Sequence, residues 1–224
     1  MKFMTTCTAI AVALTAASGA SAQGMGDFYA SVFGGFSAGE TIVDSSYSGV
    51  DVEQGLESES GYVLGVTVGS TVAPGLRAEA EVSYANYSIG SVSIAATNGV
   101  SSKSASIDAP DDTVVTTTYL LGNLWYDVPG VATGSGVLPY VGGGLGLAIV
   151  NGDVDGEDIF DQTIGIAYQA GVGVQIPVGA GLIDVGYRFK GFTGADIDFD
   201  DDSGLGGDGS GYNNNFQVGY AIKF

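Results

Sequence analysis

The sequence predicts an all-β protein, an eight-stranded antiparallel up-and-down transmembrane β-barrel. Three observations predict it. Apolar residues alternate with small or polar residues in eight segments, which is the pattern of strands whose two faces meet different surroundings. No run of about 18 uncharged apolar residues follows residue 23, so no spanning helix is expected. Charged residues make up only 14% of the chain, and most of them lie between the alternating segments.

The N-terminal residues have the pattern of a secretory signal peptide. Lys2 gives a positive start, residues 8–17 are apolar or small, and Ala20-Ser21-Ala22 offers a small-x-small cleavage site. The apolar run is too short for a transmembrane anchor. We therefore expect residues 1–22 to be a cleaved signal and residues 23–224 to form one barrel domain. Cleavage would also remove Cys7, the one cysteine of the chain.

Charge and composition exclude several classes of function. The formal net charge is −19, with 6 Lys and Arg against 25 Asp and Glu, and such a charge repels nucleic acid. The chain has no histidine, so mechanisms that use a histidine base are excluded, and loss of Cys7 would exclude a thiol nucleophile. Only carboxylate or Ser-Lys chemistry remains. We expect a protein that is not an enzyme and that uses no cofactor.

The alternating segments are the expected strands, and each is long enough to cross a bilayer as a tilted strand of about 9–11 residues. In one of them Tyr62, Leu64 and Val66 share a face, while Gly65 and Thr67 share the other. The expected strands are 27–36, 61–70, 76–88, 114–127, 138–149, 163–176, 182–192 and 212–224.

The connections between these strands alternate in length, as they do in an up-and-down barrel with external loops and periplasmic turns. The connections near 71–75, 128–137 and 177–181 are short and contain Pro and Gly, which favour turns. The long connections are 38–60, 89–113, 150–162 and 193–211. If both termini are periplasmic, these long connections are external loops, and they carry most of the carboxylates.

The ions within the expected strands fall on one face of each strand. Arg77, Glu79 and Glu81 alternate with apolar residues, and a charge facing lipid near the midplane would cost about 2–4 kcal/mol, so these ions are expected to face the lumen. The expected lumen cluster is Arg77, Glu79, Glu81, Asp127, Asp184, Arg188 and Lys190. It is interpreted as a structural plug of salt bridges, in preference to an ion path or an acid/base pair, because an eight-stranded barrel is just wide enough for side chains to fill it.

Several segments, taken in order, resemble the strands of the OmpA-like eight-stranded outer-membrane barrels, and in particular their small surface-antigen and opacity-protein branch. They are FYASVFGGFS (28–37), LRAEAEVSY (76–84), YLLGNLWYDV (119–128), LPYVGGGLGLA (138–148), AYQAGVGVQIPV (167–178) and IDVGYRFKGF (183–192). The last residues, VGYAIKF, resemble the C-terminal signal that the insertion machinery of the outer membrane reads; the matching positions are Val218, Tyr220, Ile222 and Phe224.

The resemblance implies a location in the outer membrane of a Gram-negative bacterium, in contact with its lipid and lipopolysaccharide. The chain stops after VGYAIKF. The peptidoglycan-binding domain of longer relatives, and its function, are therefore not expected here.

Two acidic stretches are weak candidates for divalent cations. Residues 151–156 resemble the start of a calcium loop, but position twelve of that loop would be Gln162 where a bidentate Glu is needed. The candidate ligands are Asp153, Asp155, Asp198, Asp200 and Asp202. A solvated acidic loop without bound metal is the favoured interpretation.

The preferred function is a structural or surface barrel with acidic external loops. The alternatives are a narrow porin-like channel and an adhesin that binds a host or neighbouring surface through its long loops, directly or through divalent cations. A strongly negative surface of this kind favours basic or cation-bridged partners.

Overall fold

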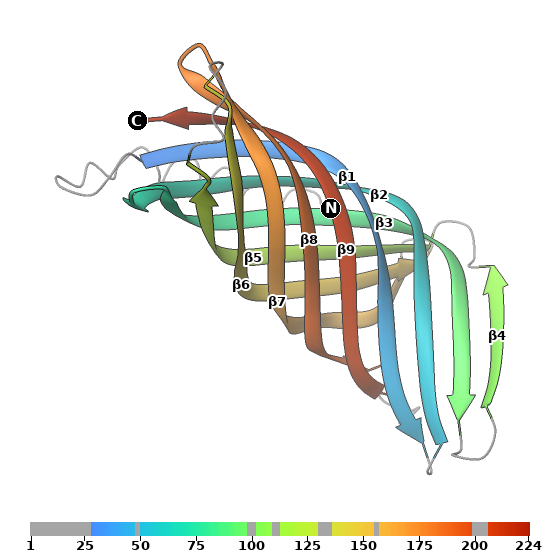
Figure 1. Cartoon of the computed structure of the whole chain (residues 1–224). Helices are drawn as coiled ribbons and strands as arrows, with labels where there is room; N and C mark the ends of the chain where they lie inside the picture. Colours follow the sequence, from blue (N-terminus) through green and yellow to red (C-terminus); the bar gives the residue numbers. More distant parts are fainter. Residues whose placement is uncertain are drawn as a thin grey trace.

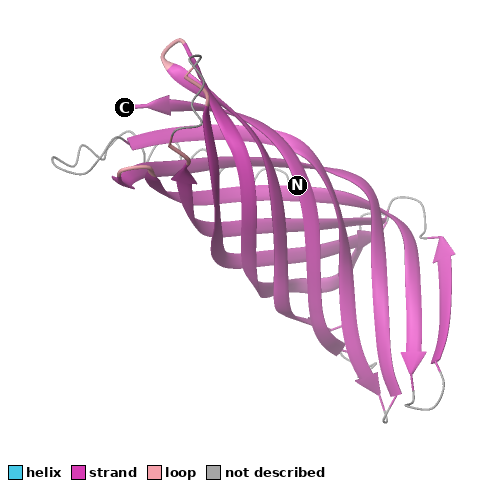
Figure 2. Ribbon diagram, viewed as in Figure 1, coloured by secondary structure: helices cyan, strands magenta, loops and turns pink. Residues whose placement is uncertain are grey.

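The structure is a computed structural model that describes residues 28–47, 50–97, 102–108, 113–129, 136–154, 157–198 and 206–224. These residues form strands and turns, with no helix among them (Figure 2). The strands are β1 (Phe28–Tyr47), β2 (Val50–Ala73), β3 (Leu76–Thr97), β4 (Ser102–Asp108), β5 (Thr113–Asp127), β6 (Leu138–Val154), β7 (Glu157–Val178), β8 (Gly181–Asp198) and β9 (Gly206–Lys223).

Eight of these strands close into an antiparallel ring (Figure 1). The order is β2-β1-β9-β8-β7-β6-β5-β3, and pairing of β2 with β3 closes it. The first strand pairs with the last, with Tyr29 opposite Lys223. The predicted eight-stranded up-and-down barrel is therefore confirmed. The short β4 lies outside the ring and pairs with the far part of β3.

The two ends of the barrel differ. We call the end that holds Phe28 and Phe224 the terminal end and the opposite end the distal end. At the terminal end the turns are tight: Gly75 (φ 74°) and Gly179 (φ 61°) adopt left-handed conformations that side chains disfavour. The backbone N–H of Phe224 donates to the carbonyl of Phe28 at 3.0 Å, which ties the two ends of the chain together.

The distal connections are not the long loops that the sequence predicted. Strand β1 continues to Tyr47 and β2 resumes at Val50, so most of 38–60 is a hairpin, and 150–162 and 193–211 are also largely strand. The prediction was wrong because it required an apolar face. A hairpin that has passed beyond the lipid needs none, and it can alternate polar residues on both sides.

Beyond the ring the strands form two blades. The β7–β8 ladder ends at Ile166 and Thr193, and the β3–β5 ladder ends at Ser88 and Val114. The wide blade comprises the distal parts of β8, β9, β1, β2 and β3 together with β4, and the narrow blade comprises those of β5, β6 and β7. In Figure 1, β1 to β4 reach furthest from the terminal end.

The outer face of the ring is apolar. Phe36 is 81% exposed, and Leu145, Ile166 and Val218 are also exposed. Aromatic rings gather at two levels. Phe28 stacks on Phe224 at the terminal end. Nearer the distal end the contacts are Tyr62 with Tyr84, Tyr168 with Phe189, Phe189 with Tyr212, and Tyr187 with Phe216. An apolar band between aromatic girdles is the surface that a bilayer contacts.

Glycines of β6 allow large side chains to enter the lumen from β5. A Cβ at Gly144 would lie 1.9 Å from Asn123 Oδ1 and 2.6 Å from the carbonyl of Gly122, so Gly144→Ala is expected to lower the free energy of unfolding by about 1–3 kcal/mol. Urea unfolding in lipid vesicles measures it. Gly122→Ala is the control, since the nearest atom to its Cβ would be 3.9 Å away; equal losses in both variants would contradict the explanation.

Candidate functional site

The lumen is filled by side chains in two layers, a polar layer toward the terminal end and an apolar layer toward the distal end. The polar layer contains all seven residues of the expected lumen cluster. Its ions come from β3, β5 and β8, and aromatic residues of β1, β5 and β6 separate them. Ionic and aromatic side chains thus occupy this part of the lumen together.

Arg77 is the centre of the first group in the polar layer. Its Nε donates to Asp127 at 2.9 Å, and its Nη1 donates to Glu79 at 3.1 Å and to the Tyr29 hydroxyl at 3.1 Å. Glu79 accepts two further hydrogen bonds, from the Tyr29 hydroxyl at 2.5 Å and from Trp125 Nε1 at 2.9 Å. Three donors therefore converge on Glu79.

Glu81 is the centre of the second group, deeper in the barrel. Its oxygens accept hydrogen bonds from Ser83 (2.8 Å), Asn123 (3.0 Å), Gln169 (2.9 Å) and the ammonium group of Lys190. Lys190 is only 1% exposed. Because β3 and β8 are four places apart in the ring, this ion pair spans the lumen and ties opposite walls together.

The third group lies around Arg188. Its Nη2 donates to the Tyr140 hydroxyl at 2.6 Å, and that hydroxyl donates to Asp184 at 2.7 Å. Arg188 also lies 3.7 Å from Asp184 and 4.2 Å above the Trp125 ring. The guanidinium group is thus held between a carboxylate and an aromatic face, a geometry that suits arginine better than lysine.

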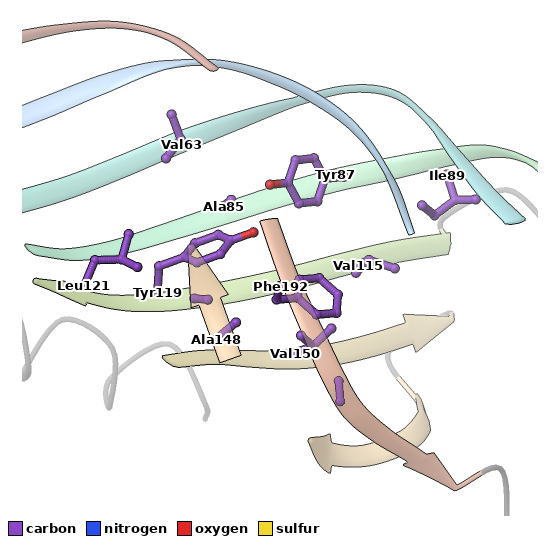
Figure 3. Packing of buried hydrophobic residues seen from close by; sticks show 12 residues of the cluster. Val63, Ala85, Tyr87, Ile89, Val115, Tyr119, Leu121, Ala148, Val150 and Phe192 are labelled. Atoms are coloured by element: carbon purple, nitrogen blue, oxygen red, sulfur yellow. The ribbon is translucent and has the colours of Figure 1, made fainter. Parts of the chain in front are cut away.

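The apolar layer closes the distal half of the lumen. Its buried residues are Val63, Ala85, Tyr87, Ile89, Val115, Tyr119, Leu121, Ala148, Val150, Ala167, Phe192 and Ala195 (Figure 3). Tyr119 lies where the layers meet, and its hydroxyl accepts a hydrogen bond from Asn213 at 2.7 Å. This layer was not predicted, because small and polar residues were expected on the inner face. The available signal was in β5, where Tyr119, Leu121 and Trp125 share the face of Asn123.

The other predicted positions lie on the surface or beyond the described residues. Val218, Tyr220, Ile222 and Phe224 are exposed on the outer face of the terminal end. Asp153 in β6 is opposite Asp158 of β7, and Asp198 of β8 is opposite Gly206 of β9. Residues 155, 200 and 202 lie outside the described part of the chain. Within that part, no three acidic, His or Cys residues are grouped so that they would hold a metal ion.

A closed ring of strands with an apolar outer band and a filled, ion-paired lumen is the architecture of an integral outer-membrane β-barrel. No helix in the described residues is long and apolar enough to cross a membrane. The model of the outer membrane protein beta-barrel domain family matches residues 8–224. The chain belongs to this family, and its place is the outer membrane of a Gram-negative bacterium. In barrels of this kind the short turns generally face the periplasm and the longer connections face outward.

Neisserial surface protein A shares the fold, and the chain is also similar to other solved structures. Neisserial surface protein A is 20% identical with a TM-score of 0.56, and the match covers 88% of this chain and 97% of that chain. The Yersinia pestis attachment invasion locus protein Ail is 12% identical (TM-score 0.41, covering 88% and 100%). The Escherichia coli outer membrane protease OmpT is 9% identical (TM-score 0.46, covering 88% and 97%). No curated protein sequence matches the chain.

The ion pair between Lys190 and Glu81 is expected to be coupled. Lys190→Met leaves a buried carboxylate without its cation, so it should lower the free energy of unfolding by about 3–5 kcal/mol. The double variant Lys190→Met/Glu81→Gln should recover a large part of that loss. Urea unfolding in vesicles measures both, with Lys223→Met, which is exposed at the terminal end, as the control. Simple addition of the two single effects would contradict direct pairing.

The polar and apolar layers of the lumen together predict that ions do not pass through the barrel. The natural protein should give no stable unitary current in planar bilayers. The double variant Glu81→Gln/Lys190→Met should not open an ion path, because it leaves the apolar layer intact. The double variant Tyr119→Ala/Phe192→Ala should not open one either, because it leaves the polar layer intact. The variant that combines all four substitutions should open an ion path. Folding of each variant is checked by the heat-dependent shift in gel mobility. Unitary currents of the natural protein, abolished by bulky lumen substitutions, would instead establish a channel.

Proposed function

We propose that the protein is a non-enzymatic surface barrel whose filled ring anchors an acidic external sheet that binds basic surfaces. The observation that carries the proposal is a row of four carboxylate residues across four neighbouring strands of the wide blade. Glu53 of β2 is opposite Asp44 of β1, Asp44 is opposite Asp208 of β9, and Asp208 is opposite Asp196 of β8. A second opposed pair, Glu40 with Glu57, lies four residues along β1 from Asp44, closer to the ring.

The row is unfavourable by itself. Directly opposed residues of antiparallel strands have Cα atoms about 4.5–5.5 Å apart, and like charges in such pairs destabilise the sheet. A ligand that brings positive charge relieves this repulsion, so its binding adds stability to the blade. Basic groups of a neighbouring or host surface fit this requirement. Divalent cations that bridge to lipopolysaccharide or to an anionic surface fit it also.

The lumen supports an anchoring role better than transport or catalysis. Each of the carboxylates Glu79, Glu81 and Asp184 accepts hydrogen bonds from protein donors. Ser83 and Lys190 form a hydrogen-bonded serine–lysine pair beside Glu81, but both residues are only 1% exposed, so a substrate would not reach them. The proposal therefore assigns the ions to barrel stability. Hydrolysis of a peptide or lipid substrate that disappears in Glu79→Gln or Asp184→Asn would contradict it.

The remaining partners follow from the surface of the barrel. Outer-membrane lipid covers the apolar band. The outward-facing Val218, Tyr220, Ile222 and Phe224 form the face of β9 that the insertion machinery would read. We further propose that residues 1–22 are removed as a signal during export, leaving residues 23–224 as the barrel domain.

Neutralising the carboxylate row tests the proposed binding surface. Asp44→Asn/Glu53→Gln/Asp196→Asn/Asp208→Asn should reduce attachment of expressing cells to polylysine-coated glass at least about tenfold and flatten its dependence on salt, because the attraction is electrostatic. The control removes the same kind of charge from the narrow blade by Asp153→Asn/Glu157→Gln/Asp158→Asn. An equal loss of attachment in both variants would mean that attachment depends only on the net charge of the protein. No loss of attachment in either variant would exclude binding through the row.

A further inference from the structure

The polar layer of the lumen encloses a cavity of about 30 Å³. Oxygen-bearing side chains from both sides of the barrel line it, among them Ser31, Thr67, Gln175, Asp184 and Gln217. A cavity of this volume has room for about two particles of the size of a water molecule. A molecule or ion bound in the cavity must be compatible with a lining that combines carboxylate oxygens with neutral oxygens.

The charges around the cavity do not balance. The buried and half-buried ions of the lumen are three cations, on Arg77, Arg188 and Lys190, and four carboxylates, on Glu79, Glu81, Asp127 and Asp184. Hydrogen-bond donors converge on Glu79 and Glu81, as described above. Lys223 is exposed at the terminal end, where water screens it. By formal charge the lumen therefore has one more carboxylate than cations, because Glu79 and Asp127 share the single cation of Arg77.

One neutral group at the cavity also lacks a partner. The Gln217 side chain is only 6% exposed and lines the cavity, and its carbonyl oxygen Oε1 has no hydrogen-bond partner. A buried carbonyl oxygen left without a partner costs about 1–3 kcal/mol. Beside it, the hydroxyls of Ser31 and Thr67 lie 2.6 Å apart and bond to each other, so each keeps a lone pair for a further contact.

We propose that the lumen cavity binds one monovalent cation, Na⁺ or an ion of similar size, through the carbonyl oxygen of Gln217 and oxygens of the neighbouring carboxylates and hydroxyls. Hard cations take oxygen ligands of this kind. A monovalent ion fits because the excess is a single charge and because the described residues offer no group of three carboxylates for a divalent metal. The guanidinium group of Arg188, which also lines the cavity, is engaged with Tyr140 and Trp125.

The bound ion completes the polar layer and stabilises the folded barrel. A cation that binds the folded state alone raises the unfolding temperature in proportion to the logarithm of its concentration above the dissociation constant. The site lies inside the ring and is independent of the carboxylate row on the wide blade. If no cation binds in the lumen, the proposed binding surface on the wide blade is unaffected.

The experiment compares thermal unfolding of the detergent-solubilised protein in NaCl and in choline chloride at constant ionic strength. Choline is too large for the cavity, so the natural protein should unfold several degrees higher in NaCl, with a saturable dependence on Na⁺. Gln217→Leu should abolish the difference. Asn214→Leu is the matched control, because Asn214 is in the same strand and bonds to Tyr187; it should retain the difference.

Gln217→Glu keeps the shape of the side chain and adds a carboxylate, and it covers the case in which Gln217→Leu does not fold. The half-saturating Na⁺ concentration should fall by about tenfold, since the added charge lies in a region of low dielectric. Equal unfolding temperatures of the natural protein in the two salts would overturn the proposal and leave only water in the cavity. An unchanged Na⁺ dependence in both Gln217 variants would overturn it as well.

Discussion

The constraint on which the rest of the structure depends is that backbone N–H and C=O groups in lipid must all be paired within the protein. The ring satisfies it by pairing β1 with β9 and β2 with β3, so that no strand edge faces hydrocarbon. Eight strands fix the diameter, and the diameter fixes a lumen that side chains must fill. The apolar outside and the crowded inside are both consequences of closing the sheet.

The lumen is filled with different chemistry at its two ends. Near the periplasm, where water has access, ions and amides from opposite walls bond across the axis. Near the outside, Val63, Tyr119 and Phe192 pack as the core of a soluble protein does. The Lys190–Glu81 pair ties walls that are far apart in the sequence, and the apolar layer packs on its distal side. Both layers thus join opposite walls of the ring and fill the space between them.

Much of the barrel could be predicted from period-two alternation, because one face of each strand meets lipid. Arg77, Glu79 and Glu81 could be placed inside for the same reason, since lipid excludes them. Tyr119, Leu121 and Trp125 could not, because strand β5 is apolar on both faces and alternation then carries no information about direction. The residues between 38 and 60 were mistaken for a loop because a hairpin in water has no apolar face. Partners across the lumen, such as Gln169 with Glu81, depend on barrel closure, which no local pattern encodes.

The unequal ladders at the distal end have a mechanical consequence. Because the β7–β8 pairing stops at Ile166 and Thr193 while the β8–β9 pairing runs on to Asp198 and Gly206, the wide blade is rooted along only part of the rim. The ladders of the wide blade continue directly from those of the ring, so a sideways shear of the blade would have to break several rows of hydrogen bonds at once. A force applied in the plane of the blade is therefore transmitted directly to the ring.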